Sequence, residues 1–401
     1  MRPHASRDPI PVCVVRQQAC GETQGIMRTA VDTLTGVEPS HDDPPVRGMS
    51  TPTATGRVMT VTGPIDPRSL GHTVTSVHLV SDLYGLSEAD LNGLSEADPN
   101  GLSDAGAGEA RVTMGLLGAL ALGAPNRDDR RLTEAIVRPE LADFAGLGGG
   151  AVVEVTGVDL GRDPRALADL ARATGVNVVM GCGGYSPSRT PGLTDRPVES
   201  LTAEIISDLR EGVDGVRAGV IGEIEALDLG RPADRALATG VAHAARRTGA
   251  PVLLDRAATT AATHALLDLM AESGADLGRV AIGHCDGLAT DADALAGLAD
   301  RGVFLQFDGL GRLPTVNREV DDQDVAAAVL ALAGRGHAER VLLSPRVARK
   351  IDLKSFGGGG YGFVTEQFVP YLGYLGADEA LLTALTESNP RRWLTMTEGR
   401  G

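Results

Sequence analysis

The chain has 401 residues and a formal net charge of −16. Its length allows one large domain or two ordinary ones, because α/β barrels commonly use about 250 residues or more. The acidic balance argues against a nucleic-acid groove or a polybasic membrane patch, since both need clustered Lys and Arg. The expected partners are small-molecule substrates, with a second copy of the chain in a homodimer as a further expectation.

The cysteine spacing and the length of the apolar runs indicate the compartment in which the protein is expected. Cys13, Cys20, Cys182 and Cys285 contain no CxxC pair, so neither a disulfide scaffold nor a zinc ribbon is indicated. The most apolar run, residues 114–125, is shorter than the roughly 20 residues that span a bilayer. The N-terminus lacks a basic segment followed by an apolar one. We expect a soluble cytoplasmic protein.

The N-terminal quarter contains two segments whose sequence pattern does not indicate a folded core. Residues 1–56 are rich in Pro, Arg, Thr and Asp without hydrophobic periodicity, which predicts a disordered extension. Met49 is an alternative start, so residues 1–48 belong to the natural protein only if translation begins upstream of it. An eight-residue unit, GLSEADLN, then repeats with decay across 85–108, which predicts a loop insertion.

Eight apolar runs alternate with stretches of helical periodicity. The runs lie at 71–82, 149–156, 176–184, 219–225, 251–256, 279–286, 303–309 and 339–346. The best helix candidates are 163–175, 233–249 and 291–302, each opening with a capping residue or Asp and closing on Gly. Apolar strands separated by helices indicate a parallel sheet, and eight units predict a (β/α)8 TIM barrel over residues 57–401. An open doubly wound sheet is the alternative, but no GxGxxG follows the first strand.

In such a barrel the active site forms at the C-terminal ends of the strands. Polar residues at those ends are Ser76, His78, Cys182, Tyr185, Glu223, Glu225, Asp255, Arg256, His284, Cys285, Asp286, Asp308, Ser344 and Arg346. Several ionisable groups are therefore expected to converge on one mouth.

Several phrases of the chain resemble the phosphotriesterase-like branch of the amidohydrolase superfamily. They include VMTVTGPIDPRSLGHT at 58–73, GRDPRALADLARATGVNVVMGCGGY at 161–185, RVAIGHCD at 279–286 and LKSFGGGGYGF at 353–363. The resemblance implies a distorted (β/α)8 barrel that typically binds two divalent metals and hydrolyses phosphotriesters, lactones or other esters. The family's ligand positions fall on Ser76, His78, Glu223, Asp255, His284 and Arg346 of this chain.

Three of those positions have changed chemistry. Ser76 and Asp255 stand where the family has His, and Arg346 stands where it has a metal-binding Asp. A guanidinium about 4 Å from a dication would be repelled by about 8 kcal/mol at an effective dielectric of about 20. We therefore expect at most one divalent ion, such as zinc, with His78, Glu223, Asp255 and His284 as the candidate ligands. The equal alternative is that Arg346 replaces the metal by pairing with Glu223 or Asp255.

Two functions follow from these readings. The first is hydrolysis of a small ester, lactone or phosphoester, with Arg346, Asp255 and Glu223 as catalytic residues. Tyr185, Arg346 and Tyr361 are then the candidate substrate-binding residues, and the proton acceptor is Asp255, Asp286 or Glu225. The second is a metal-free degenerate barrel with a biosynthetic, binding or scaffold role. Each of these ionisable residues also has a purely structural reading as a buried hydrogen-bond or ion-pair partner.

Overall fold

The computed structural model describes residues 54–83, 108–184, 196–312 and 320–400, and the barrel lies within the compact unit Pro52–Gly401. The extension predicted for residues 1–53 and the repeat insertion at 84–107 lie outside the described residues. No helix within the described ranges is long and apolar enough to cross a bilayer.

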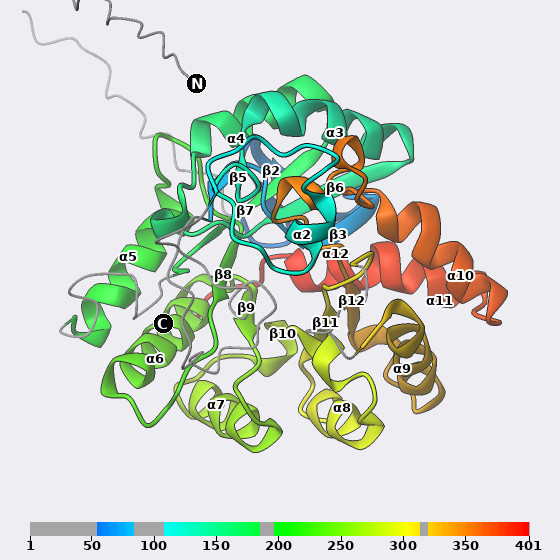
Figure 1. Cartoon of the computed structure of the whole chain (residues 1–401). Coiled ribbons are helices and arrows are strands. Elements are labelled where there is room, and N and C mark those ends of the chain that lie inside the picture. The colour runs from blue at the N-terminus through cyan, green and yellow to red at the C-terminus, as the bar shows by residue number, and fades with distance from the viewer. Residues whose placement is uncertain (1–53, 84–107, 185–195, 313–319, 401) are drawn as a thin grey trace, which may run out of the picture. The chain divides into compact units, whose positions relative to one another are not determined.

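Eight parallel strands form one sheet, and all eight predicted runs contain one of them. They are β3 (His72–Val77), β6 (Gly149–Glu154), β7 (Asn177–Cys182), β8 (Val220–Ile224), β9 (Val252–Asp255), β10 (Val280–Gly283), β11 (Phe304–Phe307) and β12 (Val341–Leu343). Each pairs with its neighbour in chain order, and the helices surround the strands (Figure 1). The predicted (β/α)8 barrel is confirmed.

The barrel closes where β3 meets β12. Within the described chain no backbone ladder joins these two strands. Instead, the Ser344 hydroxyl accepts from the Ser76 amide at 3.0 Å and donates to the Ser76 carbonyl at 2.6 Å. Just beyond, the His78 amide donates to the Val347 carbonyl at 2.8 Å. At this seam a side-chain hydroxyl therefore makes inter-strand hydrogen bonds of the kind that backbone groups make between the other strands.

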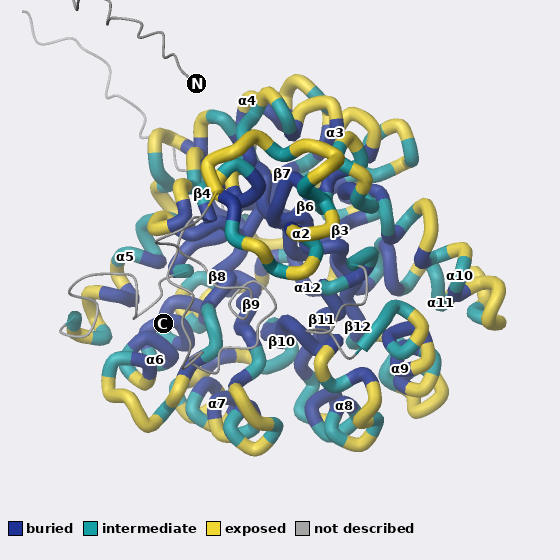
Figure 2. The backbone as a smooth tube through the Cα atoms, in the orientation of Figure 1, coloured by how far each residue is buried: buried dark blue, intermediate teal, exposed yellow. Residues whose placement is uncertain are grey.

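The outer helices begin and end where the capping signals place them. Asp163 accepts from the amides of Arg165 and Ala166 at the start of α4, and Gly175 ends that helix with φ of 76°. The main helices are α3 (Glu134–Gly146), α4 (Pro164–Thr174), α5 (Val198–Arg210), α6 (Pro232–Thr248), α7 (Thr260–Glu272), α8 (Ala292–Ala299) and α9 (Asp322–Gly334). Short helices of the described residues are α2 (Leu117–Ala121), α10 (Val369–Tyr374), α11 (Glu379–Thr383) and α12 (Asn389–Leu394). Figure 2 shows buried strands at the centre and helices exposed on their outer sides.

The first predicted strand is shorter than its sequence suggests. The run 71–82 is two strands, because the chain leaves the barrel after Val77. Its last part forms β4 (Ser81–Asp82), which pairs antiparallel with β5 (Arg131–Leu132). A second small pair, β1 (Val58–Thr60) with β2 (Gly63–Ile65), precedes the barrel. His78 therefore lies beyond the end of β3.

The barrel interior is layered because strand side chains alternate between two faces. Its apolar lower layer includes Ala151, Val153, Val179, Val220, Leu253, Ala281, Phe304 and Leu342. Helix α12 closes this end, where Trp393 is fully buried and its indole donates to the Val252 carbonyl. Polar side chains follow two of these residues along the chain. Gln306 and Asp308 come two and four residues after Phe304, and Ser344 and Arg346 come two and four residues after Leu342. The interior thus changes from apolar to charged toward the C-terminal ends of the strands.

Candidate active site

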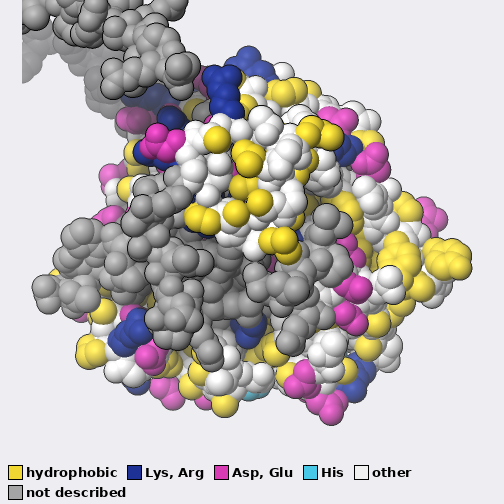
Figure 3. All heavy atoms as spheres, in the orientation of Figure 1, with side chains coloured by type: hydrophobic (Ala, Val, Ile, Leu, Met, Phe, Trp, Pro, Cys, Tyr) yellow, Lys and Arg dark blue, Asp and Glu magenta, His cyan; other side chains and the backbone are white. Residues whose placement is uncertain are grey.

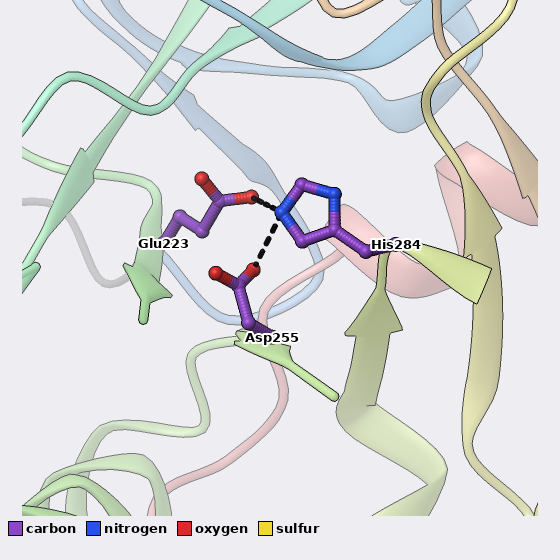
Figure 4. Close-up of side chains that lie close together, drawn as sticks. All are labelled: Glu223, Asp255 and His284. Carbon is purple, nitrogen blue, oxygen red and sulfur yellow. Dashed lines mark ion pairs between the residues drawn. The ribbon is translucent and has the colours of Figure 1, made fainter. Parts of the chain in front are cut away.

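Three buried side chains from consecutive strands converge at the barrel mouth (Figure 4). Glu223 lies in β8, Asp255 ends β9, and His284 follows β10. His284 Nε2 is 3.3 Å from Asp255 Oδ1 and 4.0 Å from Glu223 Oε1. Their ligand atoms all lie within 4.8 Å of one another. The prediction that these residues meet is therefore supported by their geometry.

Arg346 closes the other side of this cluster. Its Nη1 and Nη2 donate to Glu223 Oε1 and Oε2 at 2.6 and 2.7 Å, a bidentate pair. Nη1 also donates to the Ser76 hydroxyl at 3.1 Å. Of the two predicted partners of the guanidinium, Glu223 is the one it binds. Ser76, Glu223 and Arg346 are called the guanidinium half of the site below.

Asp308 belongs to the site, although it was not selected as a site residue from the sequence. Its Oδ1 lies 3.1 Å from His284 Nδ1, and its Oδ2 accepts from Gln306 Nε2 at 3.0 Å. The only signal in the sequence was its place at the end of the seventh predicted strand. Asp308 holds the imidazole so that Nε2 faces Asp255 and Glu223. Asp255, His284 and Asp308 form the imidazole half of the site.

Two non-glycine residues of the site have backbones in the left-handed region. His284 has φ of 56° and Arg346 has φ of 40°. Such conformations cost free energy outside glycine and persist where the surroundings enforce them. Both side chains are thereby turned into the barrel mouth immediately after their strands end.

The charges of the two halves are set by burial and by their neighbours. Burial alone lowers the pKa of His284, but Asp308 and Asp255 outweigh it and raise that pKa to about 10. Burial raises the pKa of Glu223 against the opposing charge of Arg346. The pKa of Arg346 is lowered by burial but raised further by Glu223, so the guanidinium stays charged. Without a metal, Asp308 and Asp255 thus favour the protonated form of His284 through its raised pKa.

His78 lies outside the three-residue cluster and has other partners. Its Nδ1 shares a 2.9 Å hydrogen bond with the Thr156 hydroxyl, which in turn donates to Glu154. Burial, reinforced by the charge of Arg346, lowers the pKa of His78 to about 3. Burial raises the pKa of Glu154 to about 7, against its hydrogen bond from Thr156. The metal-ligand role predicted for His78 stays a prediction.

The remaining sequence candidates occupy different places. Tyr361 is buried, and its hydroxyl donates to the His78 carbonyl at 2.8 Å. Asp286 accepts from the Asp308 and Gly309 amides and so fixes the end of β11. Glu225 is half-buried just beyond β8. Tyr185 lies outside the described residues. Of the three candidate proton acceptors, only Asp255 belongs to the cluster.

With this geometry in hand, comparison with known proteins is informative. Residues 56–394 match the model of the phosphotriesterase family. The chain belongs to the phosphotriesterase family. Family membership agrees with the barrel and with the strand-end position of the cluster.

Relatives of this phosphotriesterase family member include N-acetyltaurine hydrolase of Rattus norvegicus, 30% identical over 85% of this chain and 98% of the relative. The phosphotriesterase homology protein of Escherichia coli is 32% identical over 68% of this chain and 92% of its own length. Among solved structures, a resiniferatoxin-binding protein from Rhodobacter sphaeroides is 35% identical, with a TM-score of 0.75 over 84% of this chain and 95% of that chain.

Divalent metals are typical of the family, and the donor set of this chain fits one ion better than two. Asp255 Oδ1 and His284 Nε2 are buried and face each other at 3.3 Å, and neither atom has another hydrogen-bond partner in the described part of the chain. With Glu223 they give two oxygens and one nitrogen, a suitable set for zinc or a similar ion. On the opposite side, Glu223 already carries Arg346, a permanent cation. A second dication there would face both the guanidinium and a hydroxyl instead of two ligands.

Proposed function

We propose that this protein is a hydrolase of a small ester or amide, acting with at most one divalent metal held by Glu223, Asp255 and His284. One observation carries the proposal: three buried ligand groups from consecutive strands meet within 4.8 Å at the mouth of the barrel. The names of the relatives, N-acetyltaurine hydrolase among them, extend the candidate bonds from esters to amides. Zinc as the metal, and a cytoplasmic, homodimeric protein, are part of the same proposal.

The residues of the chain have separate tasks in this reaction. A bound divalent ion supplies Lewis-acid polarisation and makes water a better nucleophile. Asp308 orients His284, and Asp255 accepts the proton of the attacking water because, unlike Glu223, it carries no bidentate guanidinium. Arg346 fixes Glu223 in one orientation and places positive charge where an oxyanion develops. Burial of all five side chains strengthens these interactions by excluding water.

Metal content and activity of matched variants test this proposal. Protein purified without chelator is analysed for bound metals and assayed on a lactone, an aryl ester and an N-acetyl amide. Asp255→Asn should lower kcat by about 10²- to 10⁴-fold and reduce metal content, because it removes a ligand and the proton acceptor. Glu199→Gln, at an exposed residue of α5, is the control and should change neither. Wild-type protein that hydrolyses none of these substrates, or full activity in Asp255→Asn, would contradict the proposal.

A second candidate is a metal-free barrel with a repurposed biosynthetic, binding or scaffold role. It is favoured by the bidentate contact of Arg346 with Glu223, which already neutralises the central carboxylate. The same purification distinguishes the two functions. Absence of metal and of hydrolysis in the wild type, with both restored by Arg346→Asp together with Ser76→His, would select the second.

A further inference from the structure

Gln306 is a fully buried amide in β11, two residues before Asp308. Its Nε2 donates to Asp308 Oδ2 at 3.0 Å. An ionised carboxylate can only accept, so the nitrogen of this amide faces Asp308 and the oxygen is turned away. That oxygen, Gln306 Oε1, is buried and has no hydrogen-bond partner among the described residues. The orientation of the amide is therefore set by Asp308.

Asp308 lies between the imidazole of His284 and the guanidinium of Arg346. Its Oδ1 is 3.1 Å from His284 Nδ1, and its Oδ2 is 3.9 Å from Arg346 Nη1. Burial raises the pKa of Asp308, but His284, Arg346 and the Gln306 amide together hold that pKa below its ordinary value. The carboxylate is therefore ionised, and either neighbouring side chain could become its ion-pair partner.

The oxygen of Asp308 that is nearer the guanidinium is occupied by two donors. Besides the Gln306 amide, the backbone N–H of His284 donates to Oδ2, at 3.4 Å. The shorter contact, from Gln306, is the stronger of the two. It holds Asp308 in the orientation that keeps Oδ1 on the imidazole. Arg346 is thereby left to Glu223, which it binds at 2.6 Å.

Burial makes the choice of partner important. Figure 3 shows acidic and basic side chains side by side on the surface, where water screens ion pairs and a change of partner costs little. Gln306 and Asp308 are 0% exposed. Inside the barrel, a carboxylate that moves from one cation to another leaves a charge without its partner, which is strongly unfavourable. A neutral amide can hold Asp308 in place without adding a further charge.

We infer that Gln306 is a positioning residue of the site, whose amide keeps Asp308 on the imidazole of His284 and away from the guanidinium of Arg346. The ring of His284 is thereby held with Nε2 toward Asp255. Gln306 acts through Asp308, since its side chain makes no direct hydrogen bond to the cluster in the described chain. The orientation of Asp308 is a property of the metal-free protein, and only its effect on metal affinity rests on the proposed function.

Proton NMR of the full-length, metal-free protein with isotopically labelled histidine tests this inference. The hydrogen bond from His284 Nδ1 to Asp308 should give a downfield N–H resonance protected from exchange, assigned by its loss in His284→Gln. Gln306→Met keeps the length of the side chain but removes the donor. It should shift this resonance upfield and make its exchange with water faster, because Asp308 is no longer held on the ring.

Asn389 offers a matched control at the opposite end of the barrel. It is also a fully buried amide, whose Nδ2 donates to the carbonyls of Ala338 and Val341 and whose oxygen has no partner in the described residues. Asn389→Leu should lower stability without changing the His284 resonance. Thermal unfolding checks that each variant folds. An unchanged resonance in folded Gln306→Met, or equal changes in Asn389→Leu, would overturn the inference.

Zinc titration gives a second reading. Gln306→Met should weaken zinc binding about tenfold, at the lower end of the range for residues that support a metal ligand. Gln306→Met combined with Asp308→Asn should bind zinc no more weakly than Asp308→Asn alone, because the effect passes through Asp308. Additive losses in the double variant would contradict that route. The proposed function fails by a different result, absence of hydrolysis of every ester and amide, and the resonance still decides the role of Gln306.

Discussion

The two halves of the site meet where His284 Nε2 lies 4.0 Å from Glu223 Oε1, but they neutralise their acids differently. In the guanidinium half the cation is Arg346, part of the chain itself, and it occupies both oxygens of Glu223. In the imidazole half, Asp255 and Asp308 face His284 from opposite sides of its ring. In this half the positive charge comes from a proton on His284, or from a metal ion bound in place of that proton. One half is thus permanently charged, and the other can exchange its cation.

The largest expected effect comes from removing the permanent cation. Arg346→Met should lower the free energy of unfolding by about 3–5 kcal/mol, because it leaves Glu223 buried without its partner. Urea denaturation at neutral pH measures this loss. The double variant Arg346→Met with Glu223→Gln should recover most of it, since no uncompensated charge remains. A double variant no more stable than Arg346→Met would show that the pair does not behave as a unit.

A smaller effect is expected in the imidazole half. Asp308→Asn should cost about 1.5–3 kcal/mol, the usual range for a hydrogen bond to a charged group, because Asp255 still faces the ring. Metal affinity should fall about 10- to 100-fold, since His284 loses the group that orients it. Urea denaturation and metal titration provide the two readings. Asp293→Asn, at an exposed residue of α8, is the control. A stability loss equal to that of Arg346→Met would remove the contrast between the halves.

Glu154, which lies outside both halves, should make the stability of the protein depend on pH. Its pKa in the folded protein, about 7, is above its ordinary value of 4.5, so the folded state holds this proton more tightly. Its contribution to stability is complete below pH 4.5 and is lost as pH rises through about 7, by up to about 1.4 kcal/mol per unit.

Denaturation at several pH values measures this contribution. Glu154→Gln should abolish this part of the slope. Glu199→Gln, at an exposed position of α5, should preserve it. A slope unchanged by Glu154→Gln would assign the dependence to other groups.

The sequence predicted the architecture well, because strand alternation and helix caps are local signals. All eight strands and the helices α4, α6 and α8 appear where they were expected. The resemblance predicted that Glu223, Asp255, His284 and Arg346 lie together at one end of the barrel, and the structure places them there. The bounds of the first strand were wrong, since β3 ends at Val77 and the rest of the run turns away to form β4.

Side-chain partners were harder to predict than positions. Asp308 pairs with His284 because the left-handed backbone of His284 turns its ring toward β11, and no spacing in the sequence encodes that turn. His78 bonds Thr156 because the chain leaves the barrel one residue earlier. Asp286 was a candidate base, yet it holds the amides of Asp308 and Gly309. Each outcome depends on contacts between segments far apart in the chain.

The seam between β3 and β12 is held differently from the other strand pairs of the barrel. Seven strand pairs share a backbone ladder, whereas this one is joined by the hydroxyls of Ser344 and Thr75 and by the amide of His78. Opening the seam would cost fewer backbone hydrogen bonds than opening any other pair, and it would draw Ser76 away from Arg346. The fixed cation of the site therefore binds Ser76 at the strand junction that has no backbone ladder in the described chain.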